Sequence, residues 1–91
     1  MVRPRKIRRI GFNPECTYFK PRGIPLVQLD EVKLGHDEME AIRLKNLEDL
    51  DQSECAQRMK ISQSTLQRIL SSAYKKIAEA LTKGKAIKIE E

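Results

Sequence analysis

The amino-acid sequence predicts a mainly α-helical single domain over residues 1–91, and three observations carry this expectation. Apolar residues in the second half of the chain recur at steps of three and four, the spacing of one helical face. Residues that favour helix N-termini precede these stretches, and most Pro and Gly residues stand ahead of them. We expect a basic, turn-rich arm (1–33), a helical bundle (34–83) and a short tail able to form a strand (84–91). A chain of 91 residues supports only a modest core.

The arm begins with a cluster of positive charge. Five basic residues fall within the first nine positions: Arg3, Arg5, Lys6, Arg8 and Arg9. The planar guanidinium of Arg offers a fork of donors that suits phosphates and groove edges, so we expect these side chains to contact a polyanion. The alternative is a solvated charged surface with no partner.

The rest of the arm is expected to be irregular. Pro and Gly interrupt residues 10–25 repeatedly. Phe12, Tyr18 and Phe19 are expected to pack this chain onto the helical body, since no predicted sheet presents them for stacking on bases. The apolar residues between Leu26 and Leu34 then predict an extended segment that contains one short strand.

A supporting helix is predicted from Gly35 onward. Gly35 and Glu38 have capping-box spacing, and acidic residues crowd the first turn, where the helix dipole favours anions. The predicted apolar stripe of this helix comprises Met39, Ile42, Leu44 and Leu47. Leu50 is expected to pack beneath the corner that follows. His36 has no metal-ligating residues at ligand spacing, so we expect it at the surface or at the cap.

Residues 52–70 predict two helices joined by a tight corner. Asp51 with Glu54 marks the start of the first helix, and Ser62 is a good N-cap for the second. The apolar positions are Cys55, Ala56 and Met59 in the first helix, Ile61 at the corner, and Leu66, Ile69 and Leu70 in the second. Lys60 occupies the corner, where a positive φ usually selects Gly. The pattern is typical of a helix-turn-helix, whose second helix lies in the DNA major groove; the alternative is a core hairpin with no DNA role.

The second of these helices is expected to continue to Gly84, a typical C-terminal stop. Its apolar stripe runs through Leu66, Ile69, Leu70, Ala73, Ile77, Ala80 and Leu81. The tail from Lys85 to Glu90 alternates and predicts a strand. A strand needs a partner, which is either the segment around residues 26–32 or another subunit. Because of this unpaired tail, we expect a homo-oligomer.

The net charge of +5 is divided unevenly along the chain. Residues 1–22 carry +6, residues 23–61 carry −4 and residues 62–91 carry +3. The arm and the second helix of the corner are therefore suited to the same polyanionic surface.

The sequence argues against several classes of protein. No apolar run approaches the ~20 residues of a membrane span and no signal peptide is recognisable, so we expect a cytoplasmic protein without a membrane partner. Cys16 and Cys55 are too few and too far apart for a disulfide framework or a zinc site, and Cys55 is expected to be a small buried thiol. We expect no metal and no cofactor. No catalytic pairing and no Gly-rich phosphate loop is present, so we expect no enzyme.

Four stretches together resemble one protein family. They are Arg3-Pro4-Arg5-Lys6 with Arg8-Arg9, Phe19-Lys20-Pro21, Asp37-Glu38 with Glu40-Ala41-Ile42-Arg43-Leu44, and Gly84-Lys85-Ala86. In this order they closely resemble an uncharacterised family of small bacterial and archaeal proteins that are predicted to bind DNA. The resemblance covers essentially the whole chain, and implies a prokaryotic protein with a helix-turn-helix like region 4 of bacterial sigma factors.

The chain departs from that family pattern at two places. Similar proteins usually carry Gly at the corner where Lys60 stands. Many begin the second helix with Arg-Gln-Thr where this chain has Gln63-Ser64-Thr65. The resemblance therefore implies a fold and DNA binding, but no shared base preference.

Taken together, the sequence predicts a sigma-region-4-like helix-turn-helix domain with an irregular basic arm and a minor pair of short strands. We expect sequence-specific binding of double-stranded DNA by a transcriptional regulator. The candidate base and phosphate contacts on the second helix are Ser62, Gln63, Ser64, Thr65, Gln67 and Arg68. The arm residues are expected to track phosphates or enter the minor groove. The alternative is an interaction module that docks RNA polymerase or another acidic partner through the same basic surface, with the acidic middle helix as a further candidate docking face.

Overall fold

The computed structural model describes residues 17–90. The five basic arm residues lie outside the described residues, as do Phe12 and Cys16, so what was predicted for them stays a prediction. The elements in chain order are β1 (Tyr18–Phe19), a 3-10 turn (Leu26–Gln28), β2 (Glu31–Leu34), α1 (His36–Ile42), a π-helical segment (Arg43–Leu47), α2 (Gln52–Met59), α3 (Gln63–Lys83) and β3 (Ala86–Ile89). The mainly helical fold is confirmed.

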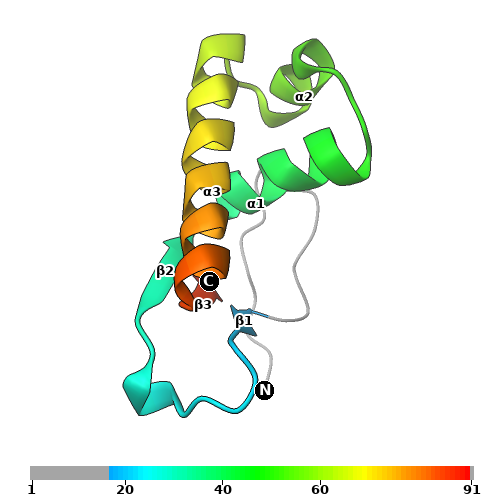
Figure 1. Ribbon diagram of the computed structural model, residues 1–91. Coiled ribbons are helices and arrows are strands. Elements are labelled where there is room, and N and C mark those ends of the chain that lie inside the picture. Colours follow the sequence, from blue (N-terminus) through cyan, green and yellow to red (C-terminus); the bar gives the residue numbers. More distant parts are fainter. Residues whose placement is uncertain (1–16, 91) are drawn as a thin grey trace.

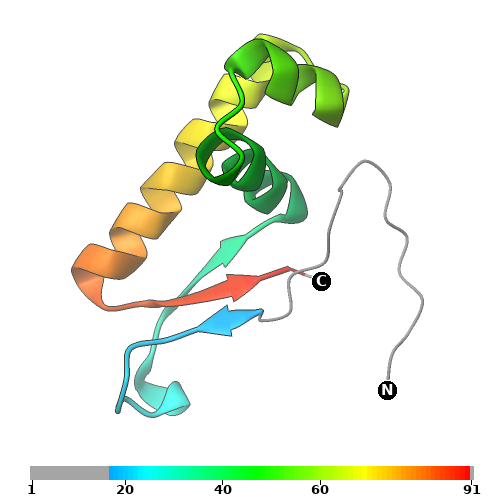
Figure 2. The same ribbon diagram turned by 90° about the vertical axis from the view of Figure 1, so that its right-hand side faces the viewer.

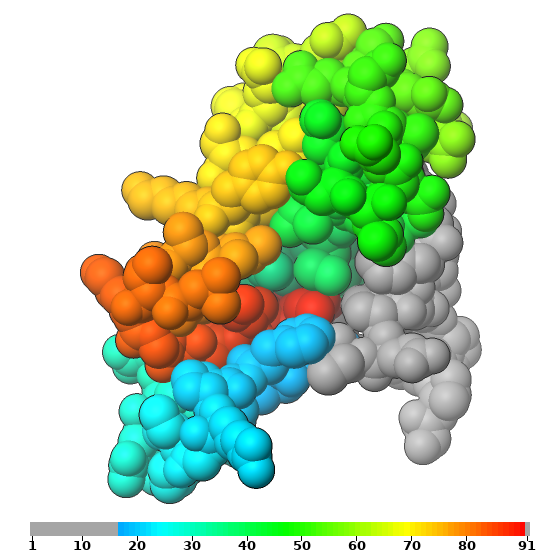
Figure 3. Space-filling model, turned by 45° about the vertical axis from the view of Figure 1, so that its right-hand side comes forward, coloured from blue at the N-terminus to red at the C-terminus, as the bar shows by residue number. Residues whose placement is uncertain are grey.

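The long helix α3 organises the molecule. Figure 1 shows α2 beside its N-terminal turns, α1 crossing behind its middle and the strands at its C-terminal end. In the space-filling view the α1–α2 region (green) and the N-terminal half of α3 (yellow) pack together above the sheet (Figure 3). Among the described residues, no helix has both the length and the apolar character that crossing a membrane requires.

The three strands form one sheet in the order β1–β3–β2 (Figure 2). The predicted tail strand is confirmed as β3, and it pairs in parallel with β2, in the register Val32↔Ile87. It also pairs antiparallel with β1, in the register Tyr18↔Lys88. The sheet therefore has three strands where the sequence predicted two. The additional strand is β1, which lies in the stretch that was expected to be irregular. Two residues are too short to show alternation, so this strand is defined by its distant partner.

The position of β3 in the sheet bears on the predicted homo-oligomer. Both edges of β3 are paired within the chain, and hence the tail offers no unpaired strand to another subunit. The homo-oligomer was predicted because the tail strand lacked a partner, and this reason does not hold. The oligomeric state stays an untested prediction.

The segment after α1 departs from the predicted helical stripe. The backbone N–H of Glu48 donates to the carbonyl of Arg43 at 2.9 Å, five residues back, so this turn is wider than an α-helical turn. The wider turn rotates the residues that follow, and Leu47 is 76% exposed. The stripe is thus confirmed at Leu44, which is buried, and wrong at Leu47.

The corner between α2 and α3 has the predicted caps. Asp51 Oδ1 accepts a hydrogen bond from the backbone N–H of Glu54 at 2.8 Å, and Ser62 Oγ accepts one from the N–H of Thr65 at 3.1 Å. Lys60 has φ 60° and ψ 46°, the left-handed conformation predicted for this position. The capping residues therefore mark where both helices begin.

The strain at the corner gives a stability prediction. Lys60→Gly is expected to raise the free energy of unfolding by about 1 kcal/mol, because Gly adopts a positive φ without the steric cost of a Cβ. Urea denaturation measures the change. The matched control is Gln57→Gly, which is expected to lose about 1 kcal/mol because Gln57 is exposed in the helical part of α2. A lower stability for Lys60→Gly would mean that the corner is unstrained.

Two apolar clusters hold the elements together. The first joins α1, α2 and α3 and comprises Ala41, Leu44, Cys55, Ala56, Met59, Leu66 and Leu70, with Leu50, Ile61 and Ile69 packed against it. The second joins α1 and α3 to the sheet through Leu34, Ala73 and Ile89, with Met39, Ile42, Ile77 and Ile87 packed against it. The predicted stripe of α3 is confirmed as far as Ala80 and wrong at Leu81, which is 76% exposed. Successive helical residues point ~100° apart, so the packing that buries Ala80 leaves Leu81 in solvent.

Candidate nucleic-acid interface

The N-cap and first two turns of α3 present most of the predicted contact residues to solvent. Ser62, Gln63, Ser64, Gln67 and Arg68 are exposed, and Thr65 is half-buried. The sequence places these residues next to one another, and the helix brings them to one end of the molecule, as Figure 1 shows for α3. Thr65 and Arg68 border the hollow on one flank of α3, and Gln67 borders the hollow on the other.

Hydrogen bonds between side chains order this turn. Ser62 Oγ lies 2.9 Å from Thr65 Oγ1 and 3.2 Å from Ser64 Oγ. Arg68 Nη2 donates to Thr65 Oγ1 at 3.4 Å, which is a long and weak bond. Among the described residues Arg68 has no carboxylate partner, so its guanidinium keeps donors available for a ligand.

The outward face of α3 extends further than the sequence analysis predicted. Ser64, Gln67, Arg68 and Ser71 are all exposed and follow at steps of three, one and three residues. Homeodomain helices read bases in the major groove from positions with this same spacing. Ser71 is not among the predicted contact residues, although the helical period alone points to it.

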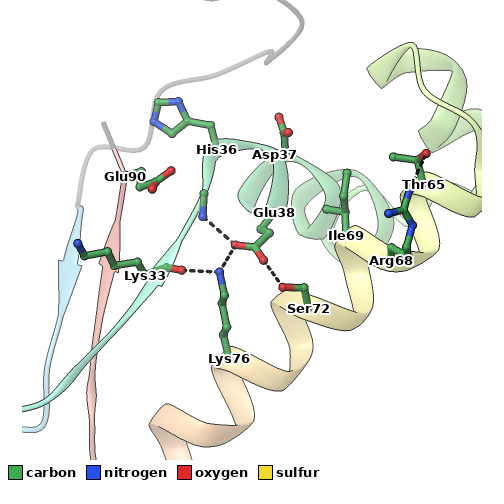
Figure 4. Close-up of a pocket in the computed structure, with 11 residues that line it drawn as sticks. Lys33, His36, Asp37, Glu38, Thr65, Arg68, Ile69, Ser72, Lys76 and Glu90 are labelled. Carbon is green, nitrogen blue, oxygen red and sulfur yellow. Dashed lines mark hydrogen bonds and ion pairs between the residues drawn. The ribbon is translucent and has the colours of Figure 1, made fainter.

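A groove of about 560 Å³ lies on one flank of α3, between that helix, the start of α1 and the ends of β2 and β3 (Figure 4). Its described lining includes three acidic side chains, which are Asp37, Glu38 and Glu90. Thr65 and Arg68 line the end of the groove that lies nearest the start of α3.

The carboxylate of Glu38 ties three elements together inside this groove (Figure 4). Its Oε1 accepts from the backbone N–H of Gly35 at 2.8 Å and from Lys76 Nζ at 2.9 Å, and its Oε2 accepts from Ser72 Oγ at 2.6 Å. Lys76 Nζ also donates to the carbonyl of Lys33 at 2.7 Å. The predicted capping bond of α1 is confirmed, and the same carboxylate also links α1 to α3.

Hydrogen bonding decides the ionisation of this group. Burial acts to raise the pKa of Glu38, but the hydrogen bonds from Ser72, the Gly35 N–H and Lys76 outweigh it, and the pKa lies below its ordinary value of 4.5. Such a carboxylate stabilises the folded chain above the unfolded-state pKa, and that stabilisation is lost as the pH falls through the folded-state pKa.

A pH-dependent stability follows from Glu38. Glu38→Gln is expected to cost about 1–3 kcal/mol at pH 7, since a buried charged acceptor with three donors is lost. The variant should also lose less stability than the native chain as the pH is lowered below about 4.5. Denaturation between pH 3 and pH 7 measures both effects. Asp37→Asn, at an exposed position in the same turn, is the control. An equally steep pH dependence in Glu38→Gln would contradict this role.

The acidic middle helix presents less negative charge than the sequence suggests. Glu38 and Glu40 are both buried. Glu40 accepts two hydrogen bonds of 3.1 Å from the guanidinium of Arg43. Of the acidic residues in α1, only Asp37 is exposed, so the docking face expected for an interaction module is mostly neutralised.

Cys55 is fully buried in the first cluster, as predicted, and burial raises the pKa of its thiol. The thiol can donate a weak hydrogen bond to the carbonyl oxygen of Leu50, which lies 3.7 Å from its Sγ.

His36, the first residue of α1, lies at the surface or cap position that was predicted for it. Within residues 17–90, no group of three or more His, Cys, Asp or Glu side chains is arranged to hold a metal ion.

Comparisons with known proteins identify relatives along the whole chain. A family model described as "Protein of unknown function DUF134" matches residues 1–91. A UPF0251 protein of Desulforudis audaxviator is 58% identical over 90 residues, which are 99% of this chain and 59% of the relative. A UPF0251 protein of Caldanaerobacter subterraneus subsp. tengcongensis is 57% identical over 90 residues, 99% of this chain and 76% of the relative.

A UPF0251 protein of Clostridium beijerinckii is 52% identical over 89 residues, which are 98% of this chain and 60% of the relative. The chain therefore spans between 59% and 76% of the length of these three relatives. No solved structure matches the chain.

Proposed function

This chain belongs to the DUF134 family, and for it we propose sequence-specific binding of double-stranded DNA by a transcriptional regulator. In this proposal α2, the Lys60 corner and α3 form a helix-turn-helix like that of sigma-factor region 4, and the N-terminal half of α3 reads the major groove. The observation that carries the proposal is the exposed, capped and acid-free first half of α3, which follows α2 through a left-handed corner.

The composition of α3 suits a polyanionic ligand. From Gln63 to Ala78 this helix carries no acidic residue, while Arg68 and Lys75 are exposed within that stretch. Residues 48–54 contain four carboxylates around the start of α2, of which Glu48 pairs with Arg43, Glu54 pairs with Arg58 and Asp51 caps the helix. The N-terminal half of α3 is thus the surface that DNA would approach with least repulsion.

The polar residues of α3 provide the chemistry of base recognition. Gln67 can pair with adenine through two hydrogen bonds and Arg68 can do so with guanine, each discriminating by ~1–3 kcal/mol. Ser64 and Ser71 can accept from or donate to either base type. In the same proposal, the basic arm adds phosphate or minor-groove contacts that strengthen binding without setting its sequence preference.

The alternative, a module that docks RNA polymerase or another acidic partner through the basic surface, stays open. Docking through the acidic middle helix has less support, because Glu38 and Glu40 are buried and paired. Retention of RNA polymerase by the protein in the absence of DNA would favour this alternative.

Selection from a pool of random duplexes at fixed salt tests the proposal. We expect enrichment of one short motif, because α3 presents about two turns of base-reading side chains. Two inverted copies with centres about 10 bp apart would indicate binding as a dimer, and one copy would indicate a monomer. No retention of any duplex even at 50 mM salt, or retention without an enriched motif, would contradict sequence-specific binding.

A further inference from the structure

The two flanks of α3 differ in their polar chemistry. The groove that contains Glu38 has three acidic and three basic side chains among its described lining residues, and Glu38 is paired with Lys76. The opposite flank holds a smaller hollow of about 380 Å³, which we call the Lys45 hollow; its described lining is Lys45, Gln52, Gln67, Leu70, Ser71 and Tyr74. None of these six side chains is acidic, and five of them carry a hydrogen-bond donor.

The Lys45 hollow joins three parts of the chain that the sequence does not show to be neighbours. Lys45 comes from the π-helical segment, Gln52 is the first residue of α2, and Gln67 and Ser71 lie on the outward face of α3. The hollow therefore borders the same residues that we propose as base readers.

The wall of the hollow is held in place by Tyr74. Its hydroxyl donates to Asn46 Oδ1 at 2.5 Å, and Asn46 lies next to Lys45 in the π-helical segment. This bond fixes the segment against α3. Tyr74 is thus a positioning residue for Lys45.

The charge of Lys45 is not neutralised within the described chain. Among residues 17–90, Lys45 makes no ion pair. Glu48, the nearest acidic residue along the sequence, pairs instead with Arg43 at 3.4 Å. A half-buried ammonium with amide and hydroxyl donors around it is suited to a singly charged oxyanion such as a phosphodiester.

We propose that the Lys45 hollow binds a backbone phosphate of the DNA strand beside the groove read by α3. Lys45 supplies the counter-charge and the Gln52 amide an additional donor. This inference rests on the proposed function, and it deepens it by fixing which flank of α3 faces that strand.

Lys45→Gln tests the inference in the full chain, with duplexes of selected and random sequence. We expect weaker binding to both duplexes by the same factor, and a slope of log K against log salt that is smaller by about 0.9, as for one lost phosphate contact. The Lys45→Arg variant should keep the native slope of log K against log salt, because the substitution keeps the positive charge. Lys83→Gln, which removes a charge at the far end of α3, should also keep it.

The outcomes separate this inference from the function on which it rests. A native slope in a folded Lys45→Gln variant would overturn the phosphate site while leaving DNA binding in place. A smaller preference between the two duplexes would overturn it as well, because Lys45 would then contact a base. If the native chain binds no duplex, the proposed function fails and this site fails with it.

Discussion

Leu66→Ala is expected to lower the free energy of unfolding by about 2–5 kcal/mol. Leu66 is fully buried in the first turn of α3, in the cluster that contains Met59 and Leu70. Removing most of its side chain leaves a cavity between α2 and α3. The folded state then loses the free energy of burying the removed apolar atoms and also the van der Waals contacts that these atoms made. Urea denaturation measures the loss.

Two variants control for this result. Leu66→Met keeps the volume and is expected to cost less than about 1.5 kcal/mol. Gln67→Ala, at the next residue, is exposed and is expected to change stability by no more than about 0.5 kcal/mol. A loss below about 1 kcal/mol for Leu66→Ala would mean that the two helices do not pack through this residue.

Arg68→Ala is expected to shrink the gap in binding free energy between the selected duplex and random DNA by about 1–3 kcal/mol. Its guanidinium is exposed on the outward face of α3, lacks a carboxylate partner among residues 17–90 and can bond guanine through two donors. Competition binding at one salt concentration measures the gap.

The control for Arg68→Ala removes the same charge without touching the proposed reading face. Lys83→Ala lies at the C-terminal end of α3, so it should leave the gap unchanged. An unchanged gap in Arg68→Ala would mean that this residue does not read a base.

Helix ends were predictable because their signals are local. Asp51 and Ser62 each bond a backbone N–H three residues on, and Gly84 ends α3 with φ 69°. Each of these motifs fits within four residues, so sequence alone identifies it. The positive φ of Lys60 was predictable for the same reason, since its place between two marked helices demands a corner.

The structure differs from the prediction, or adds to it, where the sequence carries no local signal. Nothing local marks Tyr18–Phe19 as a strand, because its partner is some 70 residues away. The wide π-helical turn after α1 places Leu47 at the surface. Such a turn holds one residue more than an α-helical turn, and the spacing of apolar residues in the sequence does not reveal it. The buried role of Glu38 depends on Ser72 and Lys76, which only the folded chain brings near it.

The candidate site divides in the same way. The exposed residues at the start of α3 follow from the cap and the helical period, and Ser71 extends them by one more step of that period. Lys45 could not be predicted, because three separate segments form its hollow.

The central claim, that α3 reads DNA sequence, is tested most directly by repeating the duplex selection with Gln67→Ala. Loss of one side chain that contacts one base pair should make a single position of the motif degenerate and leave the remaining positions as in the native motif. A motif identical to the native one at every position would contradict the claim for Gln67. If Arg68→Ala also selected the native motif, α3 would not be the element that reads the sequence.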